Sequence, residues 1–187
     1  SVSYEKSRGL TRELYERIKG PNDNVDNIMR AHSLRPHTLE GHMAIYKRVL
    51  HHPGNSVSKW FLECLGIYVS LQNCCSYCVE HHFAGLCRLL GDEERVNAIR
   101  LGLESDTFRD VFTKKEASAL QYAGKLTNAP MTVDEKDVGA LRQLGWEDGE
   151  ILEINQVTAY FAYANRTVLG LGISMKGDVL GLSPGNS

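Results

Sequence analysis

The segment over residues 56–72, SVSKWFLECLGIYVSLQ, is apolar on almost every face of the helix that it would form. A helix that is hydrophobic all round has to be covered by protein on every side. The sequence therefore predicts a central helix here, with the remaining chain packed around it. A length of 187 residues with 42% hydrophobic content suits one globular domain, and we expect a single domain over residues 1–187.

Other segments also carry helical patterns, separated by residues that end helices. The pattern VDNIMRAHSL is expected to end at Pro36, and TLEGHMAIYKRVL is followed by the turn sequence HHPGNS. Asn73 is expected to be the N-cap of a helix that runs to about Leu90 and stops at Gly91. Asp92 is expected to cap the helix after it.

Two capping boxes and a long apolar stripe predict the carboxy-terminal helices. The boxes are TKKE, with Thr113 and Glu116, and TVDE, with Thr132 and Glu135. The last helix is expected over DGEILEINQVTAYFAYANRTVLG. Because alternating strand patterns are absent from the sequence, we expect an all-α domain of about seven or eight helices. The first dozen residues and the tail GLSPGNS are the candidates for disorder.

Charge and hydropathy exclude two classes of partner. The 21 basic and 23 acidic residues give a net charge of −2 and form no basic run, so a nucleic-acid partner is not expected. No apolar run reaches the roughly 18 residues that a membrane span needs, and the first residues are charged, unlike a secretory signal. We therefore expect no membrane association and a cytoplasmic location.

The stretch NCCSYCVEHH, residues 73–82, places three cysteines and two histidines within ten positions. All cysteines of the chain lie close together, and a secreted disulfide scaffold would spread them across loops. Clustered thiols in a reducing compartment instead favour catalysis or metal binding. The five are Cys64, Cys74, Cys75, Cys78 and Cys87.

On a helix Cys75, Cys78 and His82 share one face, because they are spaced i, i+3 and i+7. Cys78 and His82 would have Cβ atoms about 5 to 6 Å apart. A helix amino terminus and a neighbouring histidine both favour the reactive thiolate. Helix position points to Cys75 as the more acidic thiol, whereas proximity to His82 points to Cys78.

Glu63 is a carboxylate inside the apolar segment WFLECLGIYV. If it is buried there, it must be paired, hydrogen-bonded or protonated, and such a group is a candidate proton relay. The alternative is a position at the rim of the helix, facing water.

The neighbouring cysteines and histidine have structural interpretations. Cys64 and Cys87 are expected to be small buried hydrophobic residues, and Cys74 to be a bystander beside the reactive face. His81 would point away from His82 by about 100°, so it is expected to be solvated or to lie behind the site.

Metal binding is the main alternative for this cluster. The two C-x-x-C thiols and the histidine on their face, completed by Glu63 or His51, could hold zinc, although no second ligand pair is present. His51 and His52 are otherwise expected to be turn residues before Pro53. Haem attachment would need a histidine where Val79 stands, and a thioredoxin-like site would need a βαβ context. A redox dithiol on an all-α scaffold fits best.

The combined spacing of Glu63, Cys75, Cys78 and His82, followed by Gly91, resembles a known family. It is the alkylhydroperoxidase D (AhpD)-like, peroxidase-related branch of the carboxymuconolactone decarboxylase superfamily. The similarity is strongest around the C-x-x-C motif, over residues 56–91. It extends more weakly to Asn165-Arg166 and to the sequence Gly170-Leu171-Gly172.

The resemblance implies a thiol-dependent peroxidase with an antioxidant role. Cys78 would attack the hydroperoxide, with His82 and Glu63 as its proton relay, and the resulting sulfenic acid would condense with Cys75 to a disulfide. An external lipoyl- or thioredoxin-like dithiol would reduce that disulfide, with no further cofactor and no metal. The family also implies a homo-oligomer, a trimer or a hexamer.

The sequence departs from AhpD itself at one site position. AhpD carries a histidine immediately before the second cysteine, where this chain has Tyr77, and a phenol is a poor base near neutral pH. Tyr77 and His81 are therefore candidates for auxiliary roles. Alternative functions are a general disulfide oxidoreductase or redox sensor, a lactone decarboxylase-like enzyme and a zinc-binding structural module.

Overall fold

The computed structural model describes residues 1–181, and this part of the chain is helical and has no strand. The all-α prediction is confirmed, with nine α-helices in the described part rather than seven or eight. The α-helices are α1 (Gly9–Ile18), α2 (Asn27–Ala31), α3 (Pro36–Leu50), α4 (Lys59–Gln72), α5 (Ser76–Leu90), α6 (Glu93–Glu104), α7 (Lys114–Asn128), α8 (Glu135–Gln143) and α9 (Asp148–Gly170). Short 3₁₀ turns are η1 (Pro21–Asp23), η2 (His32–Leu34), η3 (Phe108–Asp110) and η4 (Pro130–Thr132).

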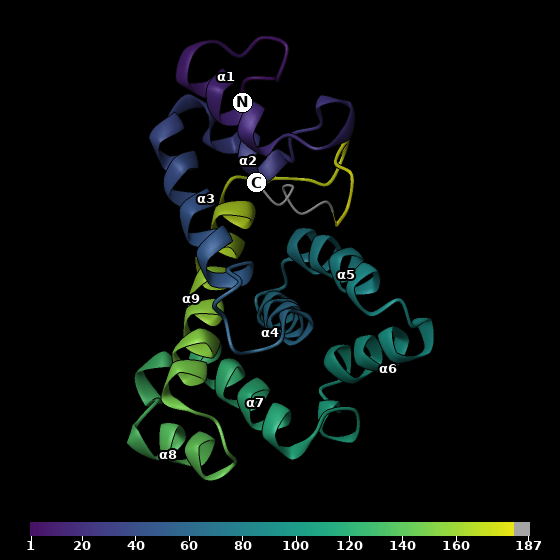
Figure 1. Ribbon diagram of the computed structural model, residues 1–187, viewed down its shortest axis with the longest axis vertical. Helices are drawn as coiled ribbons and strands as arrows, with labels where there is room; N and C mark the ends of the chain where they lie inside the picture. Colours follow the sequence, from purple (N-terminus) through teal and green to yellow (C-terminus); the bar gives the residue numbers. More distant parts are fainter. Residues whose placement is uncertain (182–187) are drawn as a thin grey trace.

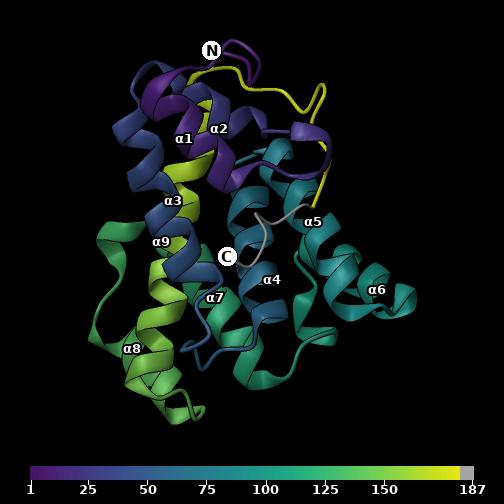
Figure 2. The same cartoon turned by 45° about the horizontal axis from the view of Figure 1, so that its top comes forward.

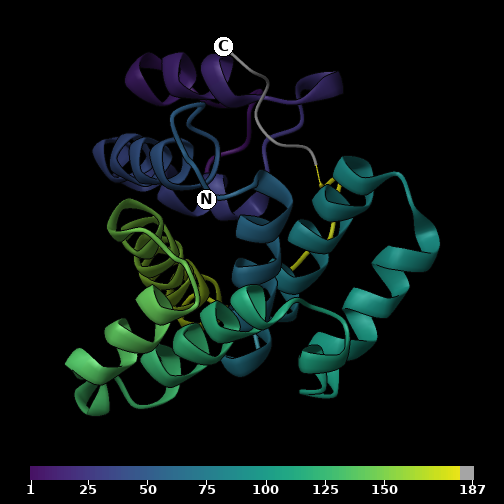
Figure 3. The ribbon, with the colours of Figure 1, turned by 60° about the horizontal axis from the view of Figure 1, so that its bottom comes forward.

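Helix α4 is the centre of the molecule, as the sequence predicts. Every residue from Phe61 to Ser70 is buried. Figure 1 looks along α4 and shows α3, α5, α6, α7 and α9 arranged around it, and Figure 3 shows the same helix from the side. An isolated apolar helix would be unstable in water, so the fold depends on this enclosure.

The close approach of α4 and α9 depends on Gly66. A β-carbon at this position would overlap the ring of Phe161, a fully buried residue of α9. The missing side chain therefore lets the two helices pack more closely than larger residues would allow.

Helix α4 ends in a Schellman motif that also starts α5. Cys74 adopts the left-handed conformation at φ 55°, and the amides of Cys74 and Cys75 donate to the carbonyls of Leu71 and Ser70. Cys75 then serves as the N-cap of α5. The predicted N-cap Asn73 is wrong, because that residue is the C-cap of α4.

From the end of α5 onward, most helix ends lie where the sequence predicts them. Gly91 ends α5 at φ 60°, and the Asp92 side chain accepts from the amide of Arg95 at the start of α6. The predicted capping box of Thr113 and Glu116 opens α7.

Two other predicted helix boundaries are wrong. Asp134 and Asp137 form the capping box of α8, in which the Asp134 carboxylate accepts from the amides of Lys136 and Asp137. Thr132 lies in η4, and Glu135 is the first helical residue. Pro36 does not end the preceding helix but begins α3, where its missing amide costs nothing.

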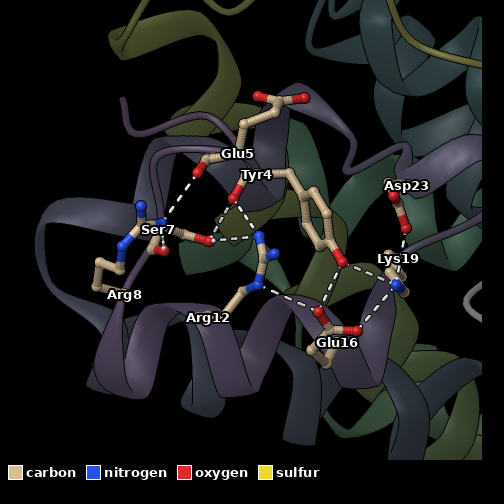
Figure 4. Close-up of polar contacts among 8 residues, drawn as sticks. All are labelled: Tyr4, Glu5, Ser7, Arg8, Arg12, Glu16, Lys19 and Asp23. Carbon is tan, nitrogen blue, oxygen red and sulfur yellow. Dashed lines mark hydrogen bonds and ion pairs between the residues drawn. The ribbon is translucent and has the colours of Figure 1, made fainter.

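The first dozen residues are folded, contrary to the expected disorder. Figure 4 shows the Tyr4 ring between Arg12 and Lys19, with its hydroxyl donating to Glu16 at 2.6 Å and accepting from Lys19 at 2.8 Å. Ser7 is buried and donates to the Tyr4 carbonyl. The expected disorder of the tail beyond Gly181 lies outside the described residues.

After α9, residues 174–181 form an extended segment that we call the C-terminal strap. Figures 1 and 2 show this yellow segment running from the end of α9 past α2 to α5. It links the amino-terminal helices to the helix that carries the C-x-x-C motif. Within residues 1–181, no helix is long and apolar enough to span a bilayer.

Candidate active site

The two C-x-x-C thiols lie at the amino terminus of α5, facing the interior. Cys75 is 0% exposed, Cys78 is 3% exposed, and neither is in a disulfide. The Schellman turn accounts for this, because it directs Cys75 inward while Cys74 stays exposed. The exposure of Cys74 agrees with its interpretation as a bystander.

The other two cysteines, Cys64 and Cys87, differ in burial. Cys64 is buried in α4, as predicted, and burial raises the pKa of its thiol. Cys87 lies on the exposed side of α5, so the prediction that it is buried is wrong. The expectation rested on residue type, but Cys87 lies on the solvent side of α5, next to the fully buried Leu86.

The C-x-x-C thiols titrate as a pair. The Cys78 thiol donates a hydrogen bond that, despite burial, lowers the pKa of Cys75 to about 7. The pKa of Cys78 is raised, first by its hydrogen bond to Cys75 and then by burial. The first thiolate of the reduced pair therefore rests on Cys75, in the position favoured by the helix amino terminus.

Asn165 of α9 completes the surroundings of the thiols. It is fully buried, donates through Nδ2 to Ser70 Oγ at 3.0 Å and accepts at Oδ1 from Asn73 Nδ2 at 3.0 Å. Hydrogen bonding from Asn165 adds to the lowering of the pKa of Cys75 and opposes part of the rise in the pKa of Cys78. Its fixed amide therefore favours negative charge on either sulfur.

Glu63 is paired with His82. The carboxylate is 3% exposed, and its Oε2 lies 2.6 Å from His82 Nδ1. The burial excludes the alternative that Glu63 faces water at the rim of α4. Phe161 packs edge-on against the His82 ring at 4.6 Å, so carboxylate and aromatic ring fix the imidazole from two sides.

A cavity of about 50 Å³ joins this pair to Cys78. A water needs roughly 10 to 15 Å³ of such space, so the cavity has room for a few water-sized groups. No hydrogen bond joins His82 directly to either thiol within residues 1–181. The lining residues are Asp26, Ile28, Met29, His42, Tyr46, Glu63, Tyr77, Cys78, His81, His82, Gly85, Tyr160, Ala164 and Gly181.

Tyr77 and His81 point to a second carboxylate, Asp178 of the C-terminal strap. The Tyr77 hydroxyl donates to Asp178 Oδ2 at 2.6 Å, and His81 Nε2 lies 3.3 Å from the same oxygen. The two rings stack at 4.4 Å. His81 is therefore not solvated, and it belongs to a contact behind the thiols, as the second alternative expected. Nearby Asp26 has a pKa raised to about 6, mainly by burial.

His42 and Tyr160 form a part of the cavity that sequence reasoning missed. His42 is buried, and its Nε2 lies 3.5 Å from the Tyr160 hydroxyl. Burial, with a smaller contribution from His32, lowers the pKa of His42 to about 3, so its imidazole is neutral at physiological pH. The nearby His51 is likewise kept neutral by burial, which lowers its pKa to about 4.

Sequence spacing offered no signal for His42 or Tyr160, which line the cavity from distant helices, or for Asp178, which reaches Tyr77 and His81 from the strap. Asn165 was recognised only as part of a familial dipeptide. Among the described residues, no group of three or more His, Cys, Asp or Glu side chains is arranged to hold a metal ion.

Comparisons by sequence find no matching protein family and no matching characterised protein. Comparison of structures finds an uncharacterised peroxidase-related protein from Silicibacter sp. TM1040, with a TM-score of 0.77 and 24% identity over 90% of this chain and 87% of that one. A second match is the alkylhydroperoxidase AhpD core of an uncharacterised peroxidase-related protein from Ralstonia eutropha JMP134. Its TM-score is 0.78, with 22% identity over 95% of this chain and 94% of that one.

A more distant match is the debrominase Bmp8, solved in complex with 2,3,4-tribromopyrrole. Its TM-score is 0.69, with 14% identity over 90% of this chain and 84% of that one. At these identities the matches establish the fold, and the debrominase shows that proteins of this fold differ in their reactions. The resemblance seen in the sequence is confirmed at this level: the chain has the all-α fold of AhpD-like, peroxidase-related proteins.

Proposed function

We propose that the protein is a thiol-dependent peroxidase that reduces small hydroperoxides with the Cys75–Cys78 dithiol. The observation that carries the proposal is that Cys78, one thiol of this buried free dithiol, lines the same cavity as the Glu63–His82 pair. The fold shared with peroxidase-related proteins supports it.

The reaction begins with attack of the Cys78 thiolate on one oxygen of the hydroperoxide. A sulfur–oxygen bond forms, the O–O bond breaks, and the leaving alkoxide takes a proton to become an alcohol. The sulfur loses two electrons to the peroxide. Cys75 then attacks the Cys78 sulfenic acid, which gives the disulfide and releases water.

Two features supply the proton transfers. Because the Cys78 thiol donates to Cys75, a shift of that proton creates the Cys78 thiolate next to the cavity. His82 donating through Nδ1 to Glu63 keeps Nε2 as the basic nitrogen, which can accept a proton and return it to the leaving oxygen. Glu63 stabilises the imidazolium formed in between.

An external dithiol of lipoyl or thioredoxin type closes the cycle by thiol–disulfide exchange, so no further cofactor is required. The role is antioxidant, in a reducing compartment such as the cytoplasm. Assembly as a homo-oligomer, a trimer or a hexamer, is part of the proposal and follows from the family resemblance.

The test is consumption of hydrogen peroxide with dithiothreitol as the reductant. Cys78→Ser should abolish turnover, Cys75→Ser should allow about one turnover per chain, and the exposed Cys87→Ser should behave like wild type. Full activity in Cys78→Ser would reject the proposal. Stoichiometric metal in the purified protein, with stability lost on chelation, would instead favour the zinc module.

A further inference from the structure

The C-terminal strap is held at both ends by side chains of other helices. At its start, Asn27 Nδ2 donates to the carbonyls of Ser174 and Lys176, at 2.9 and 3.0 Å. At its end, the Arg88 guanidinium donates to the carbonyls of Leu180, at 2.9 Å, and Gly181. Helices α2 and α5 are thus joined across the site by a segment that belongs to neither.

Asp178 fixes the middle of the strap. Its side chain is 2% exposed, and it accepts from Tyr77 Oη at 2.6 Å and from the Asn27 amide at 3.0 and 3.1 Å, with His81 Nε2 at 3.3 Å. A carboxylate buried this deeply is stable only because the Tyr77 hydroxyl and the Asn27 amide replace its hydration. We call this set of contacts the Asp178 latch.

Tyr77 extends the latch to α2. Its hydroxyl accepts from the amide of Ile28 at 3.2 Å while donating to Asp178. The first two amides of α2 are therefore satisfied by Asp178 and Tyr77, whereas the side chain of the N-cap residue Asp26 makes no capping bond. Tyr77, which precedes Cys78 in the sequence, therefore holds the C-terminal strap in place.

The strap also contributes to the wall of the cavity. Gly181 lines it and lies so close to α5 that a β-carbon there would overlap Ala84. With the strap in this position Cys78 is 3% exposed and Cys75 is 0% exposed. The space of about 50 Å³ holds a few water-sized groups, which suits hydrogen peroxide better than a hydroperoxide with a benzene ring on a tertiary carbon.

We propose that the C-terminal strap is a size-selective gate, and that the Asp178 latch determines which molecules reach the dithiol. With the latch closed, the site accepts hydrogen peroxide and small alkyl hydroperoxides. Bulky hydroperoxides, and the dithiol that reduces the disulfide, enter only when the latch opens. The choice of peroxides rests on the proposed function, but gated access to the thiols does not.

The test compares small and bulky reagents in a Cys74→Ser/Cys87→Ser background, which removes the exposed thiols. Alkylation by iodoacetamide and reaction with the larger Ellman reagent are followed for the reduced protein and for Asp178→Ala. Lys176→Ala, a change of an exposed side chain in the same strap, is the matched control. The kcat/KM values for hydrogen peroxide and cumene hydroperoxide are measured on the same variants.

We expect Asp178→Ala to raise the rate with Ellman reagent, and kcat/KM for cumene hydroperoxide, at least tenfold. The rate of alkylation by iodoacetamide and kcat/KM for hydrogen peroxide should change less than threefold. Lys176→Ala should match the background protein in all four measurements. If Asp178→Ala leaves the ratio of the Ellman rate to the iodoacetamide rate unchanged, the gate is overturned. Size-selective alkylation without peroxide turnover would overturn the proposed function and leave the gate standing.

If Asp178→Ala does not fold, a milder variant provides the test. Tyr77→Phe keeps the ring stacked on His81 but removes the hydroxyl from the latch. It should raise the Ellman rate by about threefold to tenfold, and faster hydrogen exchange of strap amides should accompany it. Wild-type exchange and an unchanged Ellman rate in this variant would contradict the latch.

Discussion

Glu63 is an ionisable residue inside an otherwise apolar helix, and the structure explains how it is tolerated. Its partner His82 comes from the next helix, and the two atoms in contact are 2.6 Å apart. A charge in such surroundings is retained only where another group compensates it. We therefore assign Glu63 to orienting and stabilising His82 rather than to direct contact with peroxide.

Glu63→Gln tests that assignment. The amide keeps the shape and can still hydrogen-bond to His82, but it cannot stabilise the imidazolium, so oxidation of Cys78 by peroxide should slow by about 10- to 100-fold. The rate is measured by stopped-flow on reduced protein. The control is Glu80→Gln. Glu80 lies on the same helix as His82 and forms a partly exposed ion pair with Arg100 of α6, so its loss should leave the wild-type rate unchanged. A wild-type rate in Glu63→Gln would make Glu63 a structural residue.

Asn165→Ala tests how the thiolate is stabilised. Loss of a buried amide that hydrogen-bonds to both sulfurs should raise the pKa of Cys75 from about 7 toward 8, equivalent to about 1 kcal/mol. The measurement is the ultraviolet absorbance of the thiolate against pH. Thr167→Ala, which alters a half-buried residue near the end of the same helix, should leave the titration in place. A lower pKa in Asn165→Ala would contradict this account.

The residues of the candidate site divide by how far apart they lie in the sequence. Helical spacing predicted that Cys75, Cys78 and His82 lie close together, whereas the pairing of His82 with Glu63 of the preceding helix was implied by the family resemblance. Asp178 meets this group only through the path of the strap. Helical periodicity carries no information about such a contact, which is why the sequence could not place it.

At the scale of helices, the all-apolar pattern of α4 predicted its central place because no other environment stabilises such a helix. The end of α4 was less predictable. Asn73 is a common N-cap, but the Schellman motif places Cys74 in a conformation usually taken by glycine. The hydrogen bonds that decide between these two outcomes depend on packing that the local sequence does not encode.

Gly66→Ala tests the contact between α4 and α9. The added methyl group overlaps the Phe161 ring, so the free energy of unfolding should fall by about 1 to 3 kcal/mol. Because Phe161 also packs on His82, peroxide reactivity should fall as well. Urea denaturation and thiol oxidation rates measure the two effects.

The matched control is Gly139→Ala in α8, where an added β-carbon meets nothing within 4 Å. Alanine is a better helix former than glycine, so this variant should be as stable as wild type or up to about 1 kcal/mol more stable. Equal stability of the Gly66 and Gly139 variants would show that α4 and α9 can move apart without cost.

At the scale of the whole molecule, buried histidines couple folding to pH. The folded-state pKa of His42 is lowered from 6.5 to about 3 by burial, so the unfolded chain binds a proton first as pH falls. Stability from this residue is fully present above pH 6.5 and is lost as pH falls toward about 3. Asp26, whose pKa is raised from 3.8 to about 6, acts in the opposite sense: its contribution is lost as pH rises through 6.

His42→Gln isolates the larger effect. Urea denaturation of wild type should show a free energy of unfolding that falls between pH 7 and pH 4, with His42 contributing up to about 5 kcal/mol over its full range. The glutamine variant should be less stable at pH 7 but should lose less on acidification. Parallel pH profiles for the two proteins would contradict a neutral buried His42.

The central claim is that Cys75 and Cys78 form the redox centre, and a thiol count tests it most directly. Reduced protein is treated with one equivalent of hydrogen peroxide, alkylated, and analysed by intact mass and peptide mapping. We predict that five free thiols fall to three, and that the two lost map to a Cys75–Cys78 disulfide. Survival of all five, or loss confined to the exposed Cys74 and Cys87, would contradict the claim.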